Sequence, residues 1–287
     1  MLNLGFVENY QEWKMILYPA AKINIGLYVT NKRTDGYHDI CSLFFPLKLS
    51  DILEFIPDQG GMLNSDHLDI SGFDIPGDRS ENLIIKACNE LRKTSDLPFF
   101  KIHLHKIIPL GAGLGGGSSD GAGILNGIQH FARPLPSFNT VREIALSLGS
   151  DCPFFLHPVS SLAYGRGENL KQMELNLKGY WISIFYPGIH VSTSEAYKKV
   201  KIAQPSLPLE HSLRMPVENW REIIHNTFEP LVFNLHPEIA DIKKGLYNAG
   251  AVFASMSGSG SSVFGIFKEK KNWTGSLGKA HVWTEQV

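Results

Sequence analysis

The sequence predicts a mixed α+β protein that folds in two halves. Segments in which every second residue is apolar alternate along the chain with segments whose apolar residues recur every three and four positions. These are the periods of strands and of amphipathic helices. A length of 287 residues is enough for one large domain or two ordinary ones. We expect a domain boundary after residue 163, with residues 1–14 as a candidate extension and residues 164–287 as the second domain.

The first strand is expected within residues 16–30, where apolar and polar residues alternate. One face of this strand is predicted to carry Ala21, Ile23, Ile25, Leu27 and Val29. Lys22 and Asn24 therefore become neighbours on the opposite face, away from the core.

Further strands and turns follow in both halves. Strands are expected at 42–55 and 101–108, and Asp35 with Gly36 marks a turn before the first of them. In the second half we expect a strand over 180–186. Residues 251–267 then form a strand, a glycine turn and another strand.

Helices are predicted where apolar residues keep helical spacing. The expected helices are 81–93, a helix from Ser119 onward, 141–148, 194–201, 217–228 and 237–248. Ser80 is the expected N-cap of the first. Thr140 and Glu143 match a capping box for helix 141–148, and Gly149 is placed to end it.

Composition excludes several classes of function. The formal net charge of −1 provides no basic surface of the kind that nucleic-acid binding needs. No apolar run approaches the roughly 18 residues of a membrane span. Cys41, Cys88 and Cys152 show no metal-binding spacing and are expected to be reduced thiols of a cytoplasmic protein.

Residues 109–123, PLGAGLGGGSSDGAG, form a glycine-rich loop between a predicted strand and a predicted helix. Glycine allows the backbone N–H groups to approach a ligand closely, and a helix start attracts anions. The dinucleotide fingerprint fits poorly because no acidic residue follows about 20 positions later. The pattern GxxxxGK[ST] fails because no lysine precedes the serines. We therefore interpret the loop as a phosphate cradle of another kind.

Three further features each allow two interpretations. Asp151 is either a helix N-cap or a carboxylate that accepts a proton from an alcohol. Lys22 is either a solvated strand residue or a cation that offsets charge on a transferring phosphoryl group. The segment SGSGSS at 257–262 is either a hairpin turn or a second glycine loop that faces the first.

Taken together, these motifs resemble those of the GHMP kinases, the small-molecule kinases that include homoserine, mevalonate and galactokinases. PLGAGLGGGSS resembles their phosphate-binding motif, AKIN their first motif and MSGSGSS their third. The segment AKINIGLYVTNKRTDGYHDI is similar to the signature sequence of the GHMP kinases that phosphorylate 4-diphosphocytidyl-2-C-methyl-D-erythritol. The later segments GSDCPFF, GRGENL and YPGIHVSTSEAY resemble that branch in the same order.

The resemblance implies an enzyme that transfers a phosphoryl group from ATP to the 2-hydroxyl of this cytidyl substrate, in the non-mevalonate isoprenoid pathway. It implies a ribosomal-S5-like N-terminal domain, a ferredoxin-like C-terminal domain and an active site between them. Mg²⁺ is expected to arrive with ATP. The expected partner is a small molecule, with neither nucleic acid nor membrane involved, and the oligomeric state is left open.

The resemblance also assigns residues. Lys22 and Asp151 match the catalytic pair, and Asn24 matches a residue near the reacting hydroxyl. The substrate-binding residues it implies are Tyr37 and His38 at the cytosine, with Tyr197 and Thr193 beside them. The implied ATP-binding residues are Pro109, Leu110, Gly111, Ala112, Gly113, Leu114, Gly115, Gly116, Gly117, Ser118 and Ser119, with Asn82 at the adenine. The third glycine loop is Ser257, Gly258, Ser259 and Gly260.

Some residues depart from the family pattern. Asp120 stands where a small or amide residue is commoner, which we expect to alter how phosphate and Mg²⁺ are held.

The sequence leaves two rival functions. One rival is another GHMP kinase, but a homoserine or mevalonate kinase has no use for the pair Tyr37 and His38. The other is an RNA-binding module, which has no use for Asp151 and needs a more basic surface.

Overall fold

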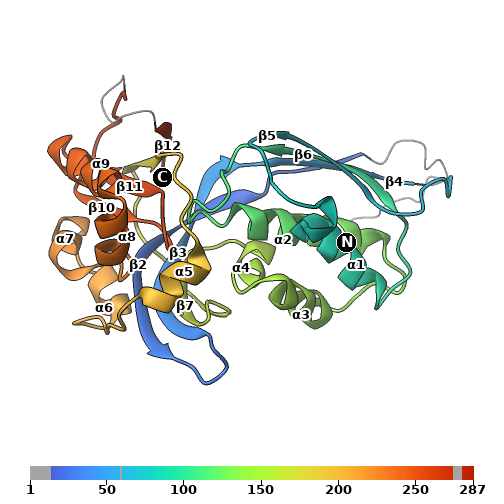
Figure 1. Ribbon diagram of the computed structural model, residues 1–287, viewed down its shortest axis with the longest axis horizontal. Coiled ribbons are helices and arrows are strands. Elements are labelled where there is room, and N and C mark those ends of the chain that lie inside the picture. The colour runs from blue at the N-terminus through green and yellow to red at the C-terminus, as the bar shows by residue number, and fades with distance from the viewer. Residues whose placement is uncertain (1–13, 59, 274–279) are drawn as a thin grey trace.

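The computed structural model describes residues 14–58, 60–273 and 280–287, so the candidate extension lies almost entirely outside the described residues. The described residues form three four-stranded sheets together with helices. Figure 1 shows two lobes on either side of a pair of long strands. The predicted mixed α+β class is confirmed.

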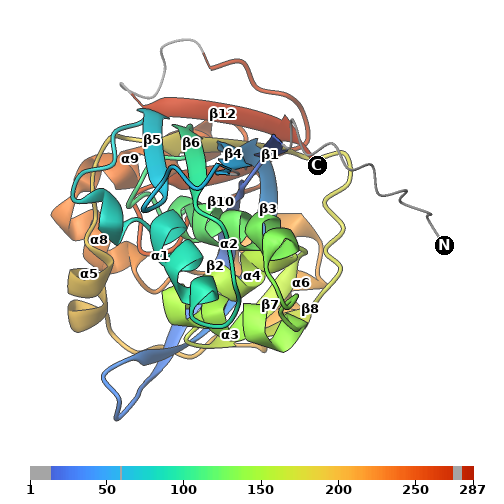
Figure 2. The ribbon, with the colours of Figure 1, turned by 90° about the vertical axis from the view of Figure 1, so that its right-hand side faces the viewer.

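The first lobe is a sheet with helices on one face (Figure 2). Its strands, in spatial order, are β1 (Met15–Leu17), β4 (Ile52–Pro57), β6 (Phe100–Lys106) and β5 (His67–Gly72). Its helices are α1 (Leu83–Arg92), α2 (Gly116–Ile128), α3 (Phe138–Leu148) and α4 (Cys152–Leu156), with short 3₁₀ turns at Arg79–Glu81 and Gln129–Phe131. Their apolar faces meet the sheet in a core around Phe100, Leu125 and Val141.

Two long strands run between the lobes. β2 (Ala20–Lys32) and β3 (His38–Ser50) form an antiparallel hairpin, and β7 (Ser161–Gly165) and β8 (Asn169–Gln172) continue the same sheet. Most of β2 is buried on both faces because each lobe packs against it. The hairpin therefore carries residues of one strand to the junction of the two lobes.

The second lobe is an antiparallel sheet packed against helices. Its strands, in spatial order, are β10 (Phe253–Met256), β11 (Val263–Phe267), β9 (Trp181–Tyr186) and β12 (His281–Gln286). Its helices are α5 (Thr193–Lys199), α6 (Leu209–Leu213), α7 (Trp220–Ile223), α8 (Glu229–Leu235) and α9 (Pro237–Asn248), with a 3₁₀ turn at Val217–Asn219. The predicted domain boundary after residue 163 falls inside β7 and stays a prediction.

β2 departs from the predicted alternation at Gly26. This glycine has a φ of 69°, and the register with β3 shifts between Ile25 and Leu27. A bulge adds one residue to a strand, so the side chains beyond it exchange faces. Ile25 and Tyr28 accordingly pack in one core cluster, while Leu27 and Val29 pack in another. The prediction of a single apolar face was wrong beyond the bulge.

Two helix caps also differ from prediction. α1 is capped by Asn82, whose Oδ1 accepts a hydrogen bond from the Ile84 backbone N at 2.9 Å, whereas Ser80 lies in the preceding 3₁₀ turn. α3 is capped by Ser137, whose Oγ accepts from the Thr140 backbone N at 3.1 Å. An N-cap needs an extended backbone immediately before the first turn, and Asn82 and Ser137 have it.

The described part of the second lobe contains three elements that the sequence did not predict, namely α6, α8 and β12. The helix expected over 217–228 is broken at Ile224, which is extended, and α8 then begins at Glu229. β12 pairs with β9, and the Glu285 carboxylate accepts hydrogen bonds from the Lys48 backbone N at 3.0 Å and the Leu49 backbone N at 3.2 Å. These bonds tie the last strand to β3, and burial raises the pKa of Glu285.

A buried ion cluster lies beneath the start of α2. The Lys106 ammonium contacts the Asp51 carboxylate and lies 2.9 Å from Asp120 Oδ2, and all three side chains are at most 3% exposed. Two carboxylates share one cation there, so burial disfavours the second negative charge. The pKa of Asp120 is raised to about 8 as a result. Asp120 faces this buried cluster, and the expectation that it alters how phosphate and Mg²⁺ are held stays a prediction.

We expect Asp120→Asn to change how stability depends on pH. Between pH of about 4 and about 8, folded wild-type protein keeps a proton on Asp120 that the unfolded chain releases. The free energy of unfolding of the wild type therefore falls as pH rises, by up to about 1.4 kcal/mol per pH unit for this one proton. The asparagine variant lacks this contribution. Urea unfolding of both proteins across the window measures it, and equal slopes would contradict the raised pKa.

Candidate active site

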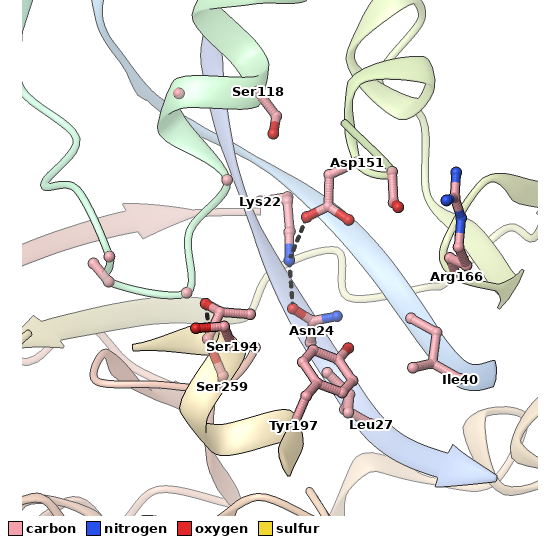
Figure 3. Close-up of a pocket in the computed structure, with 18 of the residues that line it drawn as sticks. Lys22, Asn24, Leu27, Ile40, Ser118, Asp151, Arg166, Ser194, Tyr197 and Ser259 are labelled. Atoms are coloured by element: carbon pink, nitrogen blue, oxygen red, sulfur yellow. Dashed lines mark hydrogen bonds and ion pairs between the residues drawn. The ribbon is translucent and has the colours of Figure 1, made fainter. Parts of the chain in front are cut away.

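A cavity of about 820 Å³ opens between the two lobes. It is lined from β2, the β2–β3 turn, the loop before α2, the residue before α4, the β7–β8 turn and α5. Figure 3 shows side chains from these distant segments surrounding one space. The cavity therefore brings together the motifs that the sequence analysis had considered separately.

Lys22 lies at the centre of the cavity, with its ammonium group between two partners. Nζ donates to Asn24 Oδ1 at 2.5 Å and lies 3.4 Å from Asp151 Oδ2 (Figure 3). The side chain is only 4% exposed, so these contacts replace water as partners of the ammonium group. Nζ also lies 4.8 Å from the centre of the Phe44 ring. The alternative of a solvated strand residue is wrong.

Asn24 is oriented by a short chain of hydrogen bonds. Its Nδ2 donates to Ser42 Oγ at 2.8 Å, and that hydroxyl donates to the Gly26 carbonyl at 2.7 Å. With its nitrogen held on this side, the amide presents Oδ1 to Lys22. The carbonyl at the bulge of β2 thus helps to fix the side chain nearest the lysine.

Asp151 precedes α4 but does not cap it. Its backbone is in the α region, with φ −83° and ψ −19°, and its side chain makes no capping hydrogen bond. The carboxylate is 30% exposed and points towards Lys22. The helix-cap interpretation of Asp151 was therefore wrong, and the carboxylate remains available to a ligand in the cavity.

The glycine loop runs along one side of the cavity and ends at the first turn of α2. Gly113 and Gly115 have φ values of 77° and 73°, which side chains rarely adopt. α2 begins at Gly116, and the N–H groups of its first turn have no partner within the helix. A Cβ at Gly117 would meet only Leu110 Cδ2, at 3.8 Å, so this face of the helix start is open. The arrangement suits an anion.

The third glycine loop faces the first and binds it. Ser257 Oγ donates to the Gly113 carbonyl at 2.7 Å and accepts from the Asn24 backbone N at 3.2 Å. The Ser262 backbone N donates to the Ala112 carbonyl at 3.0 Å. A Cβ at Gly113 would come within 2.0 Å of the Ser257 carbonyl oxygen, so only glycine permits this approach. The segment 257–262 is therefore more than a hairpin turn.

The end of the cavity away from the glycine loop is aromatic and basic. The His38 and Tyr197 rings lie 5.3 Å apart, and burial raises the pKa of Tyr197. Tyr37 is 53% exposed, and the Arg166 guanidinium lies 4.4 Å from the centre of its ring. Thr193 Oγ1 lies 3.0 Å from the Ser259 hydroxyl of the third loop. All these residues except Ser259 are contributed by the β2–β3 turn, the start of β3, the β7–β8 turn and α5.

Some residues assigned from the sequence lie outside the cavity lining. Leu114 and Ser119 are buried, and the Leu114 carbonyl accepts from the Lys22 backbone N at 2.9 Å. The Asn82 side chain caps α1, and its neighbour Leu83 reaches the cavity instead. Ser257 and Gly260 are buried and flank the lining segment Gly258–Ser259 in the sequence. Of the two adjacent serines, Ser118 faces the cavity (Figure 3).

The sequence analysis also missed several lining residues. They are Leu27, Lys32, Gly36, Ile40, Phe44, Leu83, Ser150, Arg166, Ser194 and Lys198. Half of them lie next to a residue that was assigned, so proximity in sequence could have indicated those. Arg166 lies within the segment GRGENL, but nothing in the sequence shows which way its side chain points.

Comparison with known proteins places the chain in a family. Residues 82–158 match the GHMP kinases N terminal domain, and residues 211–272 match GHMP kinases C terminal. A 4-diphosphocytidyl-2-C-methyl-D-erythritol kinase of Parabacteroides distasonis is 42% identical over 255 residues, which cover 89% of this chain and 92% of that protein. The chain belongs to the 4-diphosphocytidyl-2-C-methyl-D-erythritol kinase family of GHMP kinases. The kinase of the same name from Azobacteroides pseudotrichonymphae is 44% identical, over 89% of this chain and 94% of that protein.

Solved structures agree with this membership of the GHMP kinases. One of a 4-(cytidine 5′-diphospho)-2C-methyl-D-erythritol kinase aligns with a TM-score of 0.75 and 31% identity, covering 95% of this chain and 100% of that one. The mevalonate kinase of Methanococcus jannaschii aligns with a TM-score of 0.68 over 96% of this chain, at 12% identity, which shows the shared fold alone. The expected GHMP kinase fold is confirmed, and the protein is an ATP-dependent phosphotransferase.

We expect Gly117→Val to weaken ATP binding without unfolding this GHMP kinase. The position has helical φ and open space at Cβ, so the side chain fits the fold but projects into the phosphate end of the cavity. The Kd for ATP should rise at least about tenfold, or 1.4 kcal/mol, and the Tm should stay within about 4 °C. Titration calorimetry and thermal unfolding measure the two quantities.

Gly115→Val is the matched contrast to this variant. Its Cβ would lie 2.7 Å from Phe155 Cζ, and its φ is 73°, so it should lose stability as well as ATP affinity. An unchanged Kd for ATP in well-folded Gly117→Val protein would refute the phosphate cradle.

Proposed function

We propose that this kinase transfers the γ-phosphoryl group of ATP to the 2-hydroxyl of 4-diphosphocytidyl-2-C-methyl-D-erythritol. The observation that carries the proposal is the position of the Lys22–Asp151 pair, between the glycine loop and the aromatic end of one cavity. The names of the relatives, which are 40–44% identical to this chain, support the choice of acceptor.

On this proposal the triphosphate of ATP binds along the glycine loop. The N–H groups at the start of α2 and the positive end of its dipole favour the β- and γ-phosphates. Ser118 is the hydroxyl that faces them. Phosphoryl transfer depends mainly on positioning and on neutralising charge, which suits a site built from backbone donors and one lysine.

Asp151 and Lys22 act on the reacting atoms in this proposal. Asp151 accepts or orients the proton of the attacking hydroxyl, and Lys22 stabilises the charge that develops on the phosphoryl oxygens. Asp151 Oδ2 lies 3.4 Å from Lys22 Nζ, so the carboxylate and the ammonium group can reach the same reacting atoms. Asn24, hydrogen-bonded to Lys22, lies where it can contact the same hydroxyl.

The cytidyl end of the acceptor would bind between the hairpin turn and α5. Tyr37 can stack on the pyrimidine and His38 can bond its edge, with Tyr197 closing the slot behind His38. A ring of this kind is absent from mevalonate and homoserine. A binding site for a pyrimidine therefore favours the cytidyl substrate over the acceptors of those other GHMP kinases.

Mg²⁺ and the cellular setting belong to the same proposal. Among the described residues, no group of three or more His, Cys, Asp or Glu side chains could hold a metal. A Mg²⁺ that arrives with ATP keeps phosphate oxygens and water as ligands, which fits such a site. None of the described helices is sufficiently long and apolar to span a bilayer. We propose a cytoplasmic enzyme that acts on small molecules and not on nucleic acid.

A coupled assay for ADP release, run with a panel of acceptors, tests the proposal directly. The panel is 4-diphosphocytidyl-2-C-methyl-D-erythritol, mevalonate and homoserine. We expect turnover with the first alone, with the product phosphorylated at the 2-hydroxyl as seen by ³¹P NMR. Turnover with mevalonate or homoserine in preference to the cytidyl substrate would overturn it.

We expect Asp151→Asn to fold normally and to lose roughly 10²–10⁴-fold in kcat, the range for removal of a general base. Asparagine keeps the size of the side chain but accepts a proton poorly. The KM for ATP should change by less than about twofold, because the phosphates bind elsewhere. Glu143→Gln, on the exposed face of α3, is the matched control and should keep wild-type turnover. Near-wild-type kcat in Asp151→Asn would remove Asp151 from the chemistry.

A further inference from the structure

We propose that the buried cluster of Asp51, Lys106 and Asp120 positions the glycine loop, and that the net charge of the cluster sets how tightly the phosphates of ATP bind. The three residues are buried outside the cavity lining, so they act through the loop and touch no ligand. Their role rests on the proposed function, in which the triphosphate lies along the glycine loop. It provides a physical route by which Asp120 alters how phosphate is held.

Asp51 holds the chain where it enters the glycine loop. Its Oδ1 accepts hydrogen bonds from the backbone N of Ile107 at 2.5 Å and of Ile108 at 2.8 Å, immediately before Pro109. The Asp51 backbone N donates to the Pro19 carbonyl at 2.9 Å, which fixes Asp51 beside the start of β2. The carboxylate therefore anchors the first end of the loop.

Lys106 joins this anchor to the other end of the loop. Its Nζ contacts the Asp51 carboxylate and lies 2.9 Å from Oδ2 of Asp120, near the start of α2. A Cβ at Gly116 would lie 2.8 Å from Lys106 Nζ, so the ammonium group packs directly against the first residue of α2. The glycine loop is thus enclosed between two chain segments that the cluster ties together.

The charge of the cluster depends on Asp120. Its Oδ1 is buried without a hydrogen-bond partner among the described residues. Burial is the main cause that raises the pKa of Asp120 to about 8, and the neighbouring Asp51 carboxylate adds to it. When Asp120 is protonated, the Lys106 ammonium balances the Asp51 carboxylate. When Asp120 is ionised, one negative charge in the cluster is left unbalanced.

The charged groups that act on Asp120 are Lys106, at the end of β6, and Asp51, between β3 and β4. Four elements around α2 bury uncharged side chains against it or in the same core, namely Leu83 of α1, Leu17 of β1, Leu53 of β4 and Val141 of α3. α4 brings Cys152 to the first turn of α2, and burial raises the pKa of this thiol to about 12. β2 brings Lys22 to the cavity side of the glycine loop, where Asp151 is its ionic partner.

A phosphate at the start of α2 is close enough to sense this charge. Gly116 lines the cavity and also has the Lys106 ammonium packed against it, so only the first turn of α2 separates the two. Charges interact strongly across a short path from which water is excluded. Ionised Asp120 therefore disfavours bound phosphate, and the affinity for ATP should fall as pH rises through about 8. By reciprocity, bound ATP favours the proton on Asp120.

The charge effect is tested by the Kd for ATP with Mg²⁺, measured by titration calorimetry from pH of about 6.5 to about 9.5. Asp120→Asn keeps the shape of the protonated carboxyl group and cannot ionise. The two proteins should agree within about twofold at the lower pH, and wild type should bind at least about threefold more weakly than Asp120→Asn at the higher pH. Titration of ATP itself cancels, because both proteins bind the same ligand.

The positioning effect is tested by Asp120→Leu, which removes the link from Lys106 to α2 and leaves Lys106 paired with Asp51. The Kd for ATP should rise about threefold to tenfold at every pH, because a loop that is no longer held in its binding conformation must be ordered by the ligand. kcat at saturating ATP should stay within about twofold.

Asp66→Asn is the matched control for lost stability. Asp66 is a buried carboxylate that lies 2.7 Å from Arg92 and accepts a hydrogen bond from the Phe100 backbone N at 2.8 Å, at the opposite end of β6 from Lys106. The control should lower the Tm and leave the Kd for ATP within about twofold of wild type.

Two results would overturn the inference and leave the proposed function intact. If wild type and Asp120→Asn show parallel pH profiles while Gly117→Val binds ATP weakly, the cluster does not set phosphate affinity. If Asp120→Leu and Asp66→Asn weaken ATP equally, general destabilisation accounts for the loss. If Gly117→Val keeps the wild-type Kd, the glycine loop does not bind phosphate, and the proposed ATP site fails together with the inference.

Discussion

The site depends on a lysine that is buried in the middle of a strand. An ammonium group that is 4% exposed costs several kcal/mol unless the protein supplies partners for it. Asn24 supplies an oxygen from the same strand, and Asp151, just before α4 of the first lobe, supplies a carboxylate. The backbone N of the same lysine holds the glycine loop through the Leu114 carbonyl. Lys22 thus connects both the glycine loop and the Asp151 carboxylate to β2.

The bulge at Gly26 explains how a single strand serves both lobes. Before the bulge, Ile25 packs into a core that β2 shares with the sheet of the second lobe. After the bulge, the alternation of side chains between the two faces is reversed. Leu27 consequently lines the cavity together with Lys22 and Asn24, although its sequence position predicted the opposite face. The Gly26 carbonyl, freed from regular pairing, accepts from Ser42 and so helps to orient Asn24. The irregularity is therefore part of the site.

The sequence allowed prediction of the features that local chemistry determines. Alternation placed Lys22 beside Asn24, and the density of glycines marked the anion loop, because both signals lie within a few residues. Tertiary contacts decided the rest. Whether Asp151 caps a helix, whether 257–262 faces the first loop and where Arg166 points all depend on segments distant in sequence. The caps Asn82 and Ser137 were missed because several polar residues near each helix start could have served.

The continuity of the cavity has a stereochemical consequence. The glycine loop and the aromatic end belong to one space, with the Lys22–Asp151 pair between them, so donor and acceptor can be bound at the same time. A phosphoryl group that passes directly from one bound oxygen to the other is displaced once, in line. On the proposed function, a γ-phosphorus made chiral with oxygen isotopes would emerge with inverted configuration. Exchange of label between ATP and ADP would then require the acceptor to be present.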